Sequence, residues 1–447
     1  MQLRTIERAS LIAVLGLLSG WIPSVGWAAD NDPAFRTAKQ TFQVQMRKKV
    51  ATDRVAAIAA FAAFENHEAA DLIIKRGCAD VDPTVRQAAQ VAVRRLAAKS
   101  DIRKALVDEL TRGIRKPVIS EAVPELLRAL VCTEDAELQT ILLKLLDDYL
   151  TSPKGDLLLP MTLIDDFGKQ GDAEAFRAVT LFSRSKAFDA KFGYCRCVIQ
   201  AMSQIRDAQA VEWLILLIPK SQGLIQHDII QYLTKLTSLK LGDNDRAWYK
   251  WWHANKDQIE FPKGGVSTED VALTDGQQTY YGIPVCAKRI VFVLDTSGSM
   301  RGSPLYAAKT ALLQVVDSLP ESVNFDVVMF DKTVTVWQPR LIPASRQAKT
   351  ELKSTVQNRG MQSGTVSFAA IEAAFKLEPE AIYFLSDGQP TDSQPDQIFN
   401  TFSTLNRTRR VSLHTIGVVT DKGNAASLIL FMKPLAERNY GSYRLVD

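Results

Sequence analysis

A short apolar run that ends in a carboxylate and two hydroxyl groups constrains the fold of this chain most. Residues 289–294 (Arg-Ile-Val-Phe-Val-Leu) are rich in β-branched side chains, which is typical of a buried strand. Residues 295–299 (Asp-Thr-Ser-Gly-Ser) follow directly, and a helix start is expected at residues 304–309. The loop therefore lies at the carboxyl end of a strand, where ligands bind in open α/β sheets. Its oxygen-bearing side chains suit a hard cation such as Mg²⁺, which makes three residues candidate ligands: Asp295, Ser297 and Ser299.

Two later segments have the same kind of chemistry. Residues 360–365 (Gly-Met-Gln-Ser-Gly-Thr) read as a loop that ends in the hydroxyl of Thr365, and a helix is expected at residues 366–375. Residues 381–386 predict a second buried strand, which is followed at once by Asp387. The alternative is that Asp295 and the serines only cap the helix that follows them.

In this order, the three segments resemble the metal-ion-dependent adhesion site of the von Willebrand factor type A family. The motif of that family is Asp-x-Ser-x-Ser, then a Thr, then an Asp. It is matched here by five residues: Asp295, Ser297, Ser299, Thr365 and Asp387. The sequence has Ser363-Gly364 where many members have Gly-Gly before the Thr, which leaves Ser363 and Ser367 as alternative sources of the hydroxyl.

The resemblance implies a fold, an ion and a kind of partner. For residues 285–447 it implies an α/β doubly wound, mostly parallel sheet. It implies a bound Mg²⁺, with Mn²⁺ or Ca²⁺ as alternative ions, and it implies that Asp387 acts through water. An ion with only one carboxylate bound directly keeps net positive charge, and Mg²⁺ usually keeps several exchangeable waters. The expected ligand is therefore an Asp or Glu carboxylate on a partner protein.

The rest of this segment fits such a sheet, because strands and helices alternate through it. Helices are expected over three ranges: 301–319, 346–358 and 425–438. Strands are expected over four ranges: 323–330, 334–337, 411–418 and 443–446.

The first residues predict the compartment. Arg4 and Arg8 precede an apolar core at residues 11–18, and small residues follow. This pattern predicts a secretory signal peptide over residues 1–28, with cleavage near Ala28. The core is short for a transmembrane helix, although an uncleaved anchor is the alternative. The mature chain is expected to be exported, to the periplasm, the cell surface or the medium, without a membrane span.

Residues 29–262 predict a helical domain. Asp82 can cap a helix that has Pro83 at its first position, and apolar residues then recur at helical spacing. Residues 53–58 echo this segment about thirty residues earlier. Both resemble the second helix of a HEAT-type repeat. Stacked helix pairs would form an all-α solenoid with a long surface for partners, and an irregular helical domain is the alternative.

The end of the helical region is marked by tryptophans. Trp248, Trp251 and Trp252 lie on one helix face, which favours a terminal cap over an exposed ligand platform. Residues 263–284, which begin with a Gly-rich helix break, are expected to form a linker.

Composition excludes several classes of partner. The 447 residues are 46% hydrophobic and 23% charged, as in ordinary globular proteins. The net charge of +4 comes without a block of Lys and Arg, so a general nucleic-acid or membrane surface is not indicated. Cys195 and Cys197 lack the further Cys or His residues of a zinc site and are expected to be helical core thiols; a disulfide stays open.

Three functions remain. A non-enzymatic binding protein that holds an acidic partner through Mg²⁺ fits the residues best. A metal-dependent hydrolase would need a general base beside the metal, and the sequence offers no candidate. RNA binding is the third, because the Ro autoantigen family also joins helical repeats to a von Willebrand factor type A domain. The signal peptide and the mild charge argue against RNA.

Overall fold

The computed structural model describes residues 32–116, 119–151, 157–262, 278–420 and 425–446. The chain divides into two compact units, Met1–Leu145 and Leu146–Asp447. The expected signal peptide at residues 1–28 lies outside the described residues, as does most of the expected linker, residues 263–277.

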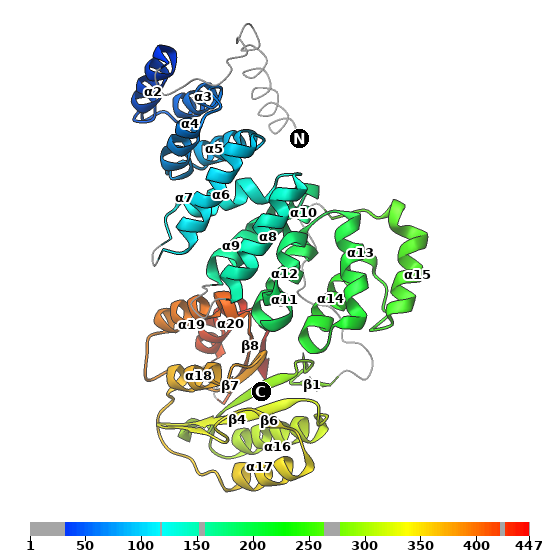
Figure 1. Cartoon of the computed structure of the whole chain (residues 1–447). Helices are drawn as coiled ribbons and strands as arrows, with labels where there is room; N and C mark the ends of the chain where they lie inside the picture. The colour runs from blue at the N-terminus through cyan, green and yellow to red at the C-terminus, as the bar shows by residue number, and fades with distance from the viewer. Residues whose placement is uncertain (1–31, 117–118, 152–156, 263–277, 421–424, 447) are drawn as a thin grey trace. The chain divides into compact units, whose positions relative to one another are not determined.

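In the part of the first unit that the structure describes, the regular elements are helices (Figure 1). They are α2 (Pro33–Gln45), α3 (Ala51–Ala62), α4 (His67–Ile73), a short π-helical turn η1 (Ile74–Cys78), α5 (Pro83–Leu96), α6 (Ser100–Ile114), α7 (Ala122–Val131) and the first part of α8 (Ala136–Thr151). Each helix buries one face, as the spacing of Val85, Ala89 and Leu96 in α5 illustrates. The expected cap is also present, because Asp82 accepts a hydrogen bond from the Thr84 amide of α5.

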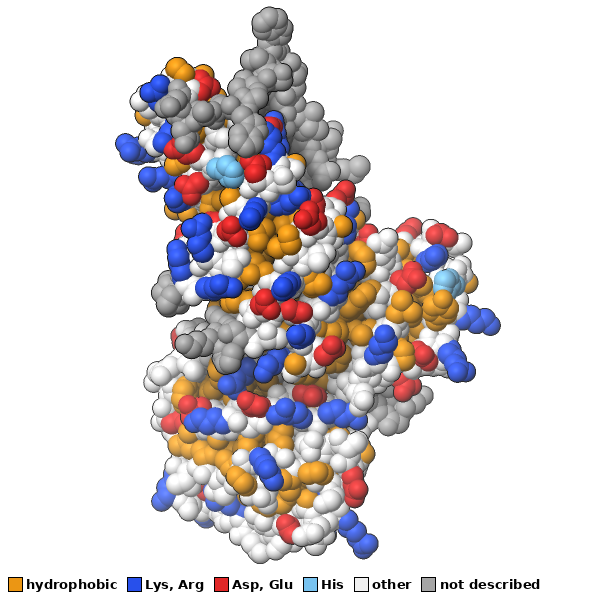
Figure 2. Space-filling model, in the orientation of Figure 1, with side chains coloured by type: hydrophobic (Ala, Val, Ile, Leu, Met, Phe, Trp, Pro, Cys, Tyr) orange, Lys and Arg blue, Asp and Glu red, His pale blue; other side chains and the backbone are white. Residues whose placement is uncertain are grey.

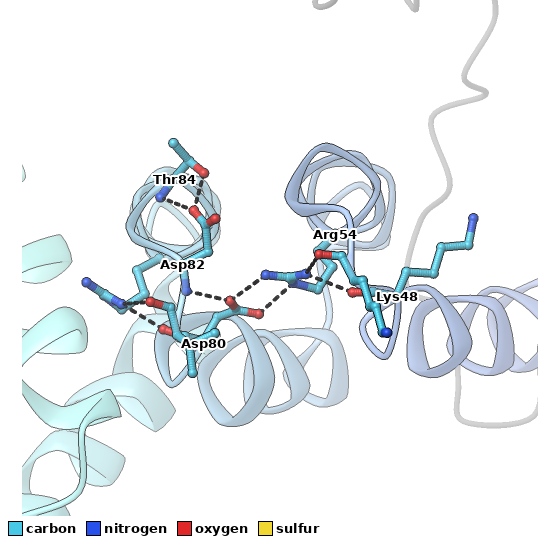
Figure 3. A network of polar contacts seen from close by, with 8 residues as sticks. Lys48, Arg54, Asp80, Asp82 and Thr84 are labelled. Atoms are coloured by element: carbon cyan, nitrogen blue, oxygen red, sulfur yellow. Dashed lines mark hydrogen bonds and ion pairs between the residues drawn. The ribbon is translucent and has the colours of Figure 1, made fainter.

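A buried arginine joins two helices of this unit, α3 and α5 (Figure 3). The Arg54 guanidinium donates from Nε and Nη2 to the two carboxylate oxygens of Asp80, at 2.9 Å each. Its Nη1 donates to the carbonyl oxygens of Lys48 and Lys49. Asp80 also accepts from the Asp82 amide, so one ion pair connects the start of α3 with the start of α5. The all-helical region is confirmed, while the HEAT-like repeat geometry stays a prediction.

The second unit begins with further helices that lead to the sheet. They are α9 (Leu158–Gln170), α10 (Ala173–Ser183), α11 (Lys186–Ala190), α12 (Phe192–Gln204), α13 (Ala208–Leu217), η2 (Ile218–Lys220), α14 (Gly223–Thr237), α15 (Asp245–Asn255) and η3 (Lys256–Gln258). Trp248 and Trp252 of α15 are fully buried. The Trp248 indole donates to the Gly242 carbonyl at 2.9 Å, and the Trp252 indole donates to Glu212 of α13 at 3.4 Å. These two rings therefore pack inward rather than form an exposed platform, while Trp251 is partly exposed.

The sheet is mostly parallel, as expected. Its strands run in the order β5-β4-β3-β7-β8-β9, and β6 also pairs with β4. Their bounds are β3 (Arg289–Asp295), β4 (Asn324–Phe330), β5 (Val334–Val336), β6 (Ile342–Pro343), β7 (Ala381–Ser386), β8 (Ser412–Val418) and β9 (Tyr443–Val446). Among the described strands of this sheet, β5 and β6 pair antiparallel with β4, and the other pairs are parallel. Ahead of the sheet, β1 (Thr279–Tyr280) and β2 (Ile283–Pro284) form a hairpin whose Tyr280 and Ile283 are buried in the core of the sheet domain.

Helices cover both faces of this sheet (Figure 1). On one face, α16 (Ser303–Ser318) and α17 (Arg346–Asn358) pack against alternate strand residues such as Phe292 and Val327. On the other, α18 (Ser367–Lys376), α19 (Pro395–Arg409) and α20 (Ala425–Glu437) pack against the intervening residues, such as Val293 and Phe384. This is the doubly wound α/β arrangement that the alternating sequence pattern predicted.

Within the second unit, α12 is joined to the sheet domain by buried polar contacts. Arg196 donates to the Arg410 carbonyl at 2.6 Å and pairs with Asp228 of α14. Arg410 reaches back to Asp165 of α9 and to the Cys197 thiol. The expectation of helical core thiols is confirmed for Cys197, which is buried. All five cysteines of the chain are free.

Candidate metal centre

The two carboxylates of the motif lie at the ends of neighbouring strands. Asp295 is the last residue of β3, and Asp387 follows the last residue of β7. The two strands are parallel, with Leu294 opposite Leu385, so both carboxylates emerge at the same edge of the sheet. From β3 the chain passes to β4 on one side and later returns to β7 on the other, so this edge is a switch point of the kind where α/β folds bind ligands.

The Asp295 carboxylate is fully buried and held in one orientation. Its Oδ1 accepts a hydrogen bond of 2.8 Å from the Ser297 amide, and its Oδ2 accepts one from the Ser386 hydroxyl. Burial raises the pKa of Asp295 to about 6, against the lowering effect of the bonds from Ser297 and Ser386. The negative charge of Asp387 raises this pKa further.

A chain of hydroxyl groups links the first segment of the motif with the last. Ser297 Oγ lies 3.0 Å from Ser299 Oγ, and Ser299 donates to Asp387 Oδ1 at 2.8 Å. The other oxygen of Asp387 accepts from the Thr420 hydroxyl at 2.9 Å. The short helical turn η4 (Gly298–Met300) gives Ser299 this position beside Asp387.

The middle segment of the motif reaches the same edge. A bridge between Ser297 and Gln362 sets residues 359–366 beside the first loop. Thr365 is buried, and its Oγ1 would lie 3.8 Å from a Cβ atom at Gly388, the residue after Asp387. Of the two alternatives, Ser363 is exposed on the loop. Ser367 is buried as the first residue of α18, with no hydrogen-bond partner for its hydroxyl among the described residues.

The assembled group suits a hard divalent cation. All five side chains offer oxygen atoms, two of them in carboxylates at the ends of neighbouring strands, whose negative charge a cation would offset. In the described part of the chain, no three His, Cys, Asp or Glu side chains gather as they do in a zinc centre. A metal here would therefore rely on hydroxyl oxygens in addition to the two carboxylates, which is the chemistry of Mg²⁺ or Mn²⁺ rather than of a soft metal.

Three residues that the sequence did not single out also shape this edge. Ser386 orients Asp295, and Thr420 orients Asp387. The Thr391 hydroxyl oxygen accepts a hydrogen bond from the Thr365 amide, at 3.1 Å. Ser386 and Thr420 lie at or just after the ends of β7 and β8, and this position is the signal that could have identified them.

Comparison with known proteins identifies the domain that contains these residues. The model of the von Willebrand factor type A domain matches residues 288–445. Inter-alpha-trypsin inhibitor heavy chain H4 of Bos taurus is 32% identical over 150 residues, which are 30% of this chain and 16% of that protein. Heavy chain H3 of Mus musculus is 38% identical over 103 residues, which are 22% of this chain and 12% of that protein. The matched segment is thus a small part of these relatives.

A solved structure, described as von Willebrand factor type A from Catenulispora acidiphila, is 20% identical to this chain. It covers 37% of this chain and 40% of its own, with a TM-score of 0.32. The family model and the relatives together establish that residues 288–445 are a von Willebrand factor type A domain, and this domain follows a region of helices.

Proposed function

We propose that this chain is an exported, non-enzymatic binding protein that grips an acidic group of a partner protein through a divalent metal, Mg²⁺ first of all. Five residues would hold the ion: Asp295, Ser297, Ser299, Thr365 and Asp387. The observation that carries the proposal is the meeting of three distant segments at one edge of the sheet. Ser299 bonds to Asp387, Ser297 lies 3.0 Å from Ser299, and Ser297 forms a backbone bridge with Gln362. Domains of the von Willebrand factor type A family typically mediate protein interaction and adhesion.

The chemistry of the site supports a carboxylate ligand. Asp295 and Asp387 supply the negative charge, and the remaining oxygens belong to neutral hydroxyls. A bound Mg²⁺ supplies a positive centre that attracts an anionic oxygen from outside the chain. The protein contributes orientation, because the hydrogen bonds from Ser386 and Thr420 hold the two carboxylates before any ligand arrives.

The hydrogen bonds described for the two carboxylates come from hydroxyl and amide groups. Asp295 accepts from Ser297 and Ser386, and Asp387 accepts from Ser299 and Thr420, so these bonds orient both carboxylates. A hydrolase would also need a general base beside the metal, and the sequence offers no candidate. Figure 2 shows Lys and Arg interspersed with Asp and Glu over the face in view, without a block of one sign. That mixture gives no support to a nucleic-acid surface.

Two further parts of the proposal concern the helices and the compartment. The helical region, as a HEAT-like array, would serve as a second interaction scaffold in addition to the metal site. The signal-like pattern of residues 1–28 supports export. Across the described residues, the helices are all too short or too polar to span a lipid bilayer.

The experiment selects peptides from a random display library on the immobilised full chain in Mg²⁺. The bound peptides are expected to share an Asp or Glu, to elute with EDTA, and to lose binding when that residue becomes Asn or Gln. Peptides that stay bound in EDTA, or that bind equally well as the amide variants, would contradict the proposal. The matched protein variant is Ser299→Ala. It removes one hydroxyl that would hold the ion and leaves both carboxylates in place.

A further inference from the structure

We propose that Asp331 is a positioning residue for the metal centre, because it fastens both ends of the loop at residues 359–366 that carries Thr365. This inference rests on the proposed function. It concerns residues outside the five-residue motif, and it assigns to the Asp331–Arg359 pair the task of holding the loop ready for the ion.

The side chain of Asp331 holds the beginning of the loop. Asp331 follows β4 directly and is fully buried. Its Oδ2 accepts a hydrogen bond of 2.8 Å from Nη2 of Arg359, the residue at which α17 gives way to the loop. Its Oδ1 accepts from the amide and the hydroxyl of Thr333, so both carboxylate oxygens are engaged.

The backbone of Asp331 holds the end of the same loop. Its carbonyl accepts a hydrogen bond of 3.0 Å from the amide of Val366, the residue after Thr365. Between these two ties the loop passes closely over Lys332. Gly364 has φ +107°, and a Cβ there would lie 3.1 Å from the Lys332 Cβ and 3.2 Å from its Cα. The loop is thus held at both ends, and it closely approaches the chain just after Asp331.

Arg359 extends this arrangement to the first segment of the motif. Its Nη1 donates to the Thr335 hydroxyl at 3.0 Å, and its Nε lies 3.4 Å from the Thr296 hydroxyl. Thr296 in turn donates its amide to the Phe330 carbonyl at 2.7 Å, one residue before Asp331. One guanidinium therefore connects the loop of Asp295 with the loop of Thr365.

A loop fixed in this way improves metal binding, because residues 359–366 lose less conformational freedom when the ion binds. Partners behind direct ligands typically change metal affinity 10- to 100-fold when they are removed. Asp331 would affect metal binding through the position of the loop rather than through its own charge, because its carboxylate bonds to Arg359 and Thr333.

A substitution of Asp331 or Arg359 also removes a buried ion pair, which can lower the stability of the whole domain. The test must therefore separate an effect on the position of the loop from general destabilisation. The chain offers a matched control in Arg196–Asp228, a similarly buried pair at 2.7 Å that lies between α12 and α14. Asp331→Asn keeps an oxygen for Thr333 and removes the charge that faces Arg359. Asp228→Asn makes the equivalent change in the control pair.

Two measurements on the full chain test the inference. Calorimetric titration with Mg²⁺ is expected to give a dissociation constant 10- to 100-fold higher for Asp331→Asn and unchanged for Asp228→Asn. Hydrogen exchange in the metal-free chain is expected to be faster over residues 359–366 in Asp331→Asn only. Arg359→Gln is the second variant, and the double variant should bind no more weakly than the weaker single one, because the two residues act as one unit.

The outcomes are distinguishable. If the unaltered chain binds no Mg²⁺, the proposed function fails, and the inference fails with it. If the unaltered chain binds Mg²⁺ and both variants of the pair bind it equally well, only the inference is overturned. Equal weakening by Asp228→Asn would also overturn it, because the effect would then be one of general stability.

Discussion

The Ser299 hydroxyl donates a 2.8 Å hydrogen bond to Asp387, a residue 88 positions later in the chain. The bond joins the loop after β3 to the loop after β7, and Ser297 Oγ lies 3.0 Å from Ser299 Oγ. These contacts bring the side chains of three motif residues together: Ser297, Ser299 and Asp387. A bound ion would add a shared centre for their oxygens.

Gly364 provides the first prediction. Its φ of +107° is unfavourable for any residue with a side chain, and an added Cβ would press on the backbone and side chain of Lys332. We expect Gly364→Ala to displace Thr365 and to weaken Mg²⁺ binding at least 10-fold in calorimetry. Gly360 is the control, because a Cβ there meets nothing within 4 Å. Equal affinity in the two variants would show that Thr365 needs no such support.

Arg410 provides a prediction about the contact between the helices and the sheet domain. Its guanidinium bonds to Gln200 and Asp165 and lies over the Tyr440 ring, so truncation would leave buried polar groups without a partner. We expect Arg410→Ala to lower the free energy of unfolding by roughly 2 kcal/mol in urea denaturation. Arg407→Ala, at an exposed position of α19, should change it by less than about 0.5 kcal/mol.

The buried ring of His414 leads us to expect that the protein loses stability in acid. Burial lowers the pKa of His414 to about 3, and the charges of Arg196 and His227 lower it further. The ring accepts the Ser442 amide at 3.0 Å through Nδ1, which requires the neutral form at that atom. Because the unfolded chain takes up the proton near pH 6.5 and the folded chain does not, this histidine costs about 1.4 kcal/mol per pH unit as the pH falls below 6.5.

The measurement is urea denaturation of the full chain between pH 7 and pH 5. His414→Gln is expected to have a shallower loss of stability than the unaltered chain over this interval. His253→Gln, which changes an exposed histidine on α15, should keep the original slope. Parallel slopes for all three proteins would contradict the assignment of the acid sensitivity to His414.

For Asp326 we expect the opposite dependence on pH, a contribution to stability that is lost as the pH rises. Burial raises the pKa of Asp326 to about 7, although hydrogen bonds from the Val327 and Gln338 amides lower it. The stability contributed by the protonated form is fully present below the unfolded pKa near 3.8 and is lost as the pH rises through 7. The stability of Asp326→Asn, which keeps an oxygen for both amides, should increase relative to the unaltered chain from pH 4 to about pH 7 and then keep a constant difference. An unchanged difference across that range, in thermal denaturation, would refute the argument.

The sequence predicted the main elements of the sheet domain closely, because each has a strong local signal. The helix expected at residues 346–358 coincides with α17, and the strand expected at residues 443–446 coincides with β9. The helix α19 was not predicted, because the polar residues of its outer surface weaken the apolar pattern of Ile398 and Phe402.

The motif residues could be named from sequence because their order and spacing form a known pattern. Their supporting residues could not. Asp331, Arg359 and Thr420 are ordinary polar residues in the sequence, and their roles follow from which loops meet at the edge of the sheet. The same is true of Arg410, whose partners on α9 and α12 are more than 200 residues away.

The central claim is tested most directly by titrating Mg²⁺ into the unaltered chain and into Asp295→Ala by calorimetry. Asp295 is the buried carboxylate that Ser297 and Ser386 orient, and its loss should leave the fold largely intact by circular dichroism. The account predicts saturable binding near one ion per chain for the unaltered protein and no measurable binding for the variant. Equal Mg²⁺ affinity in the two proteins would contradict it.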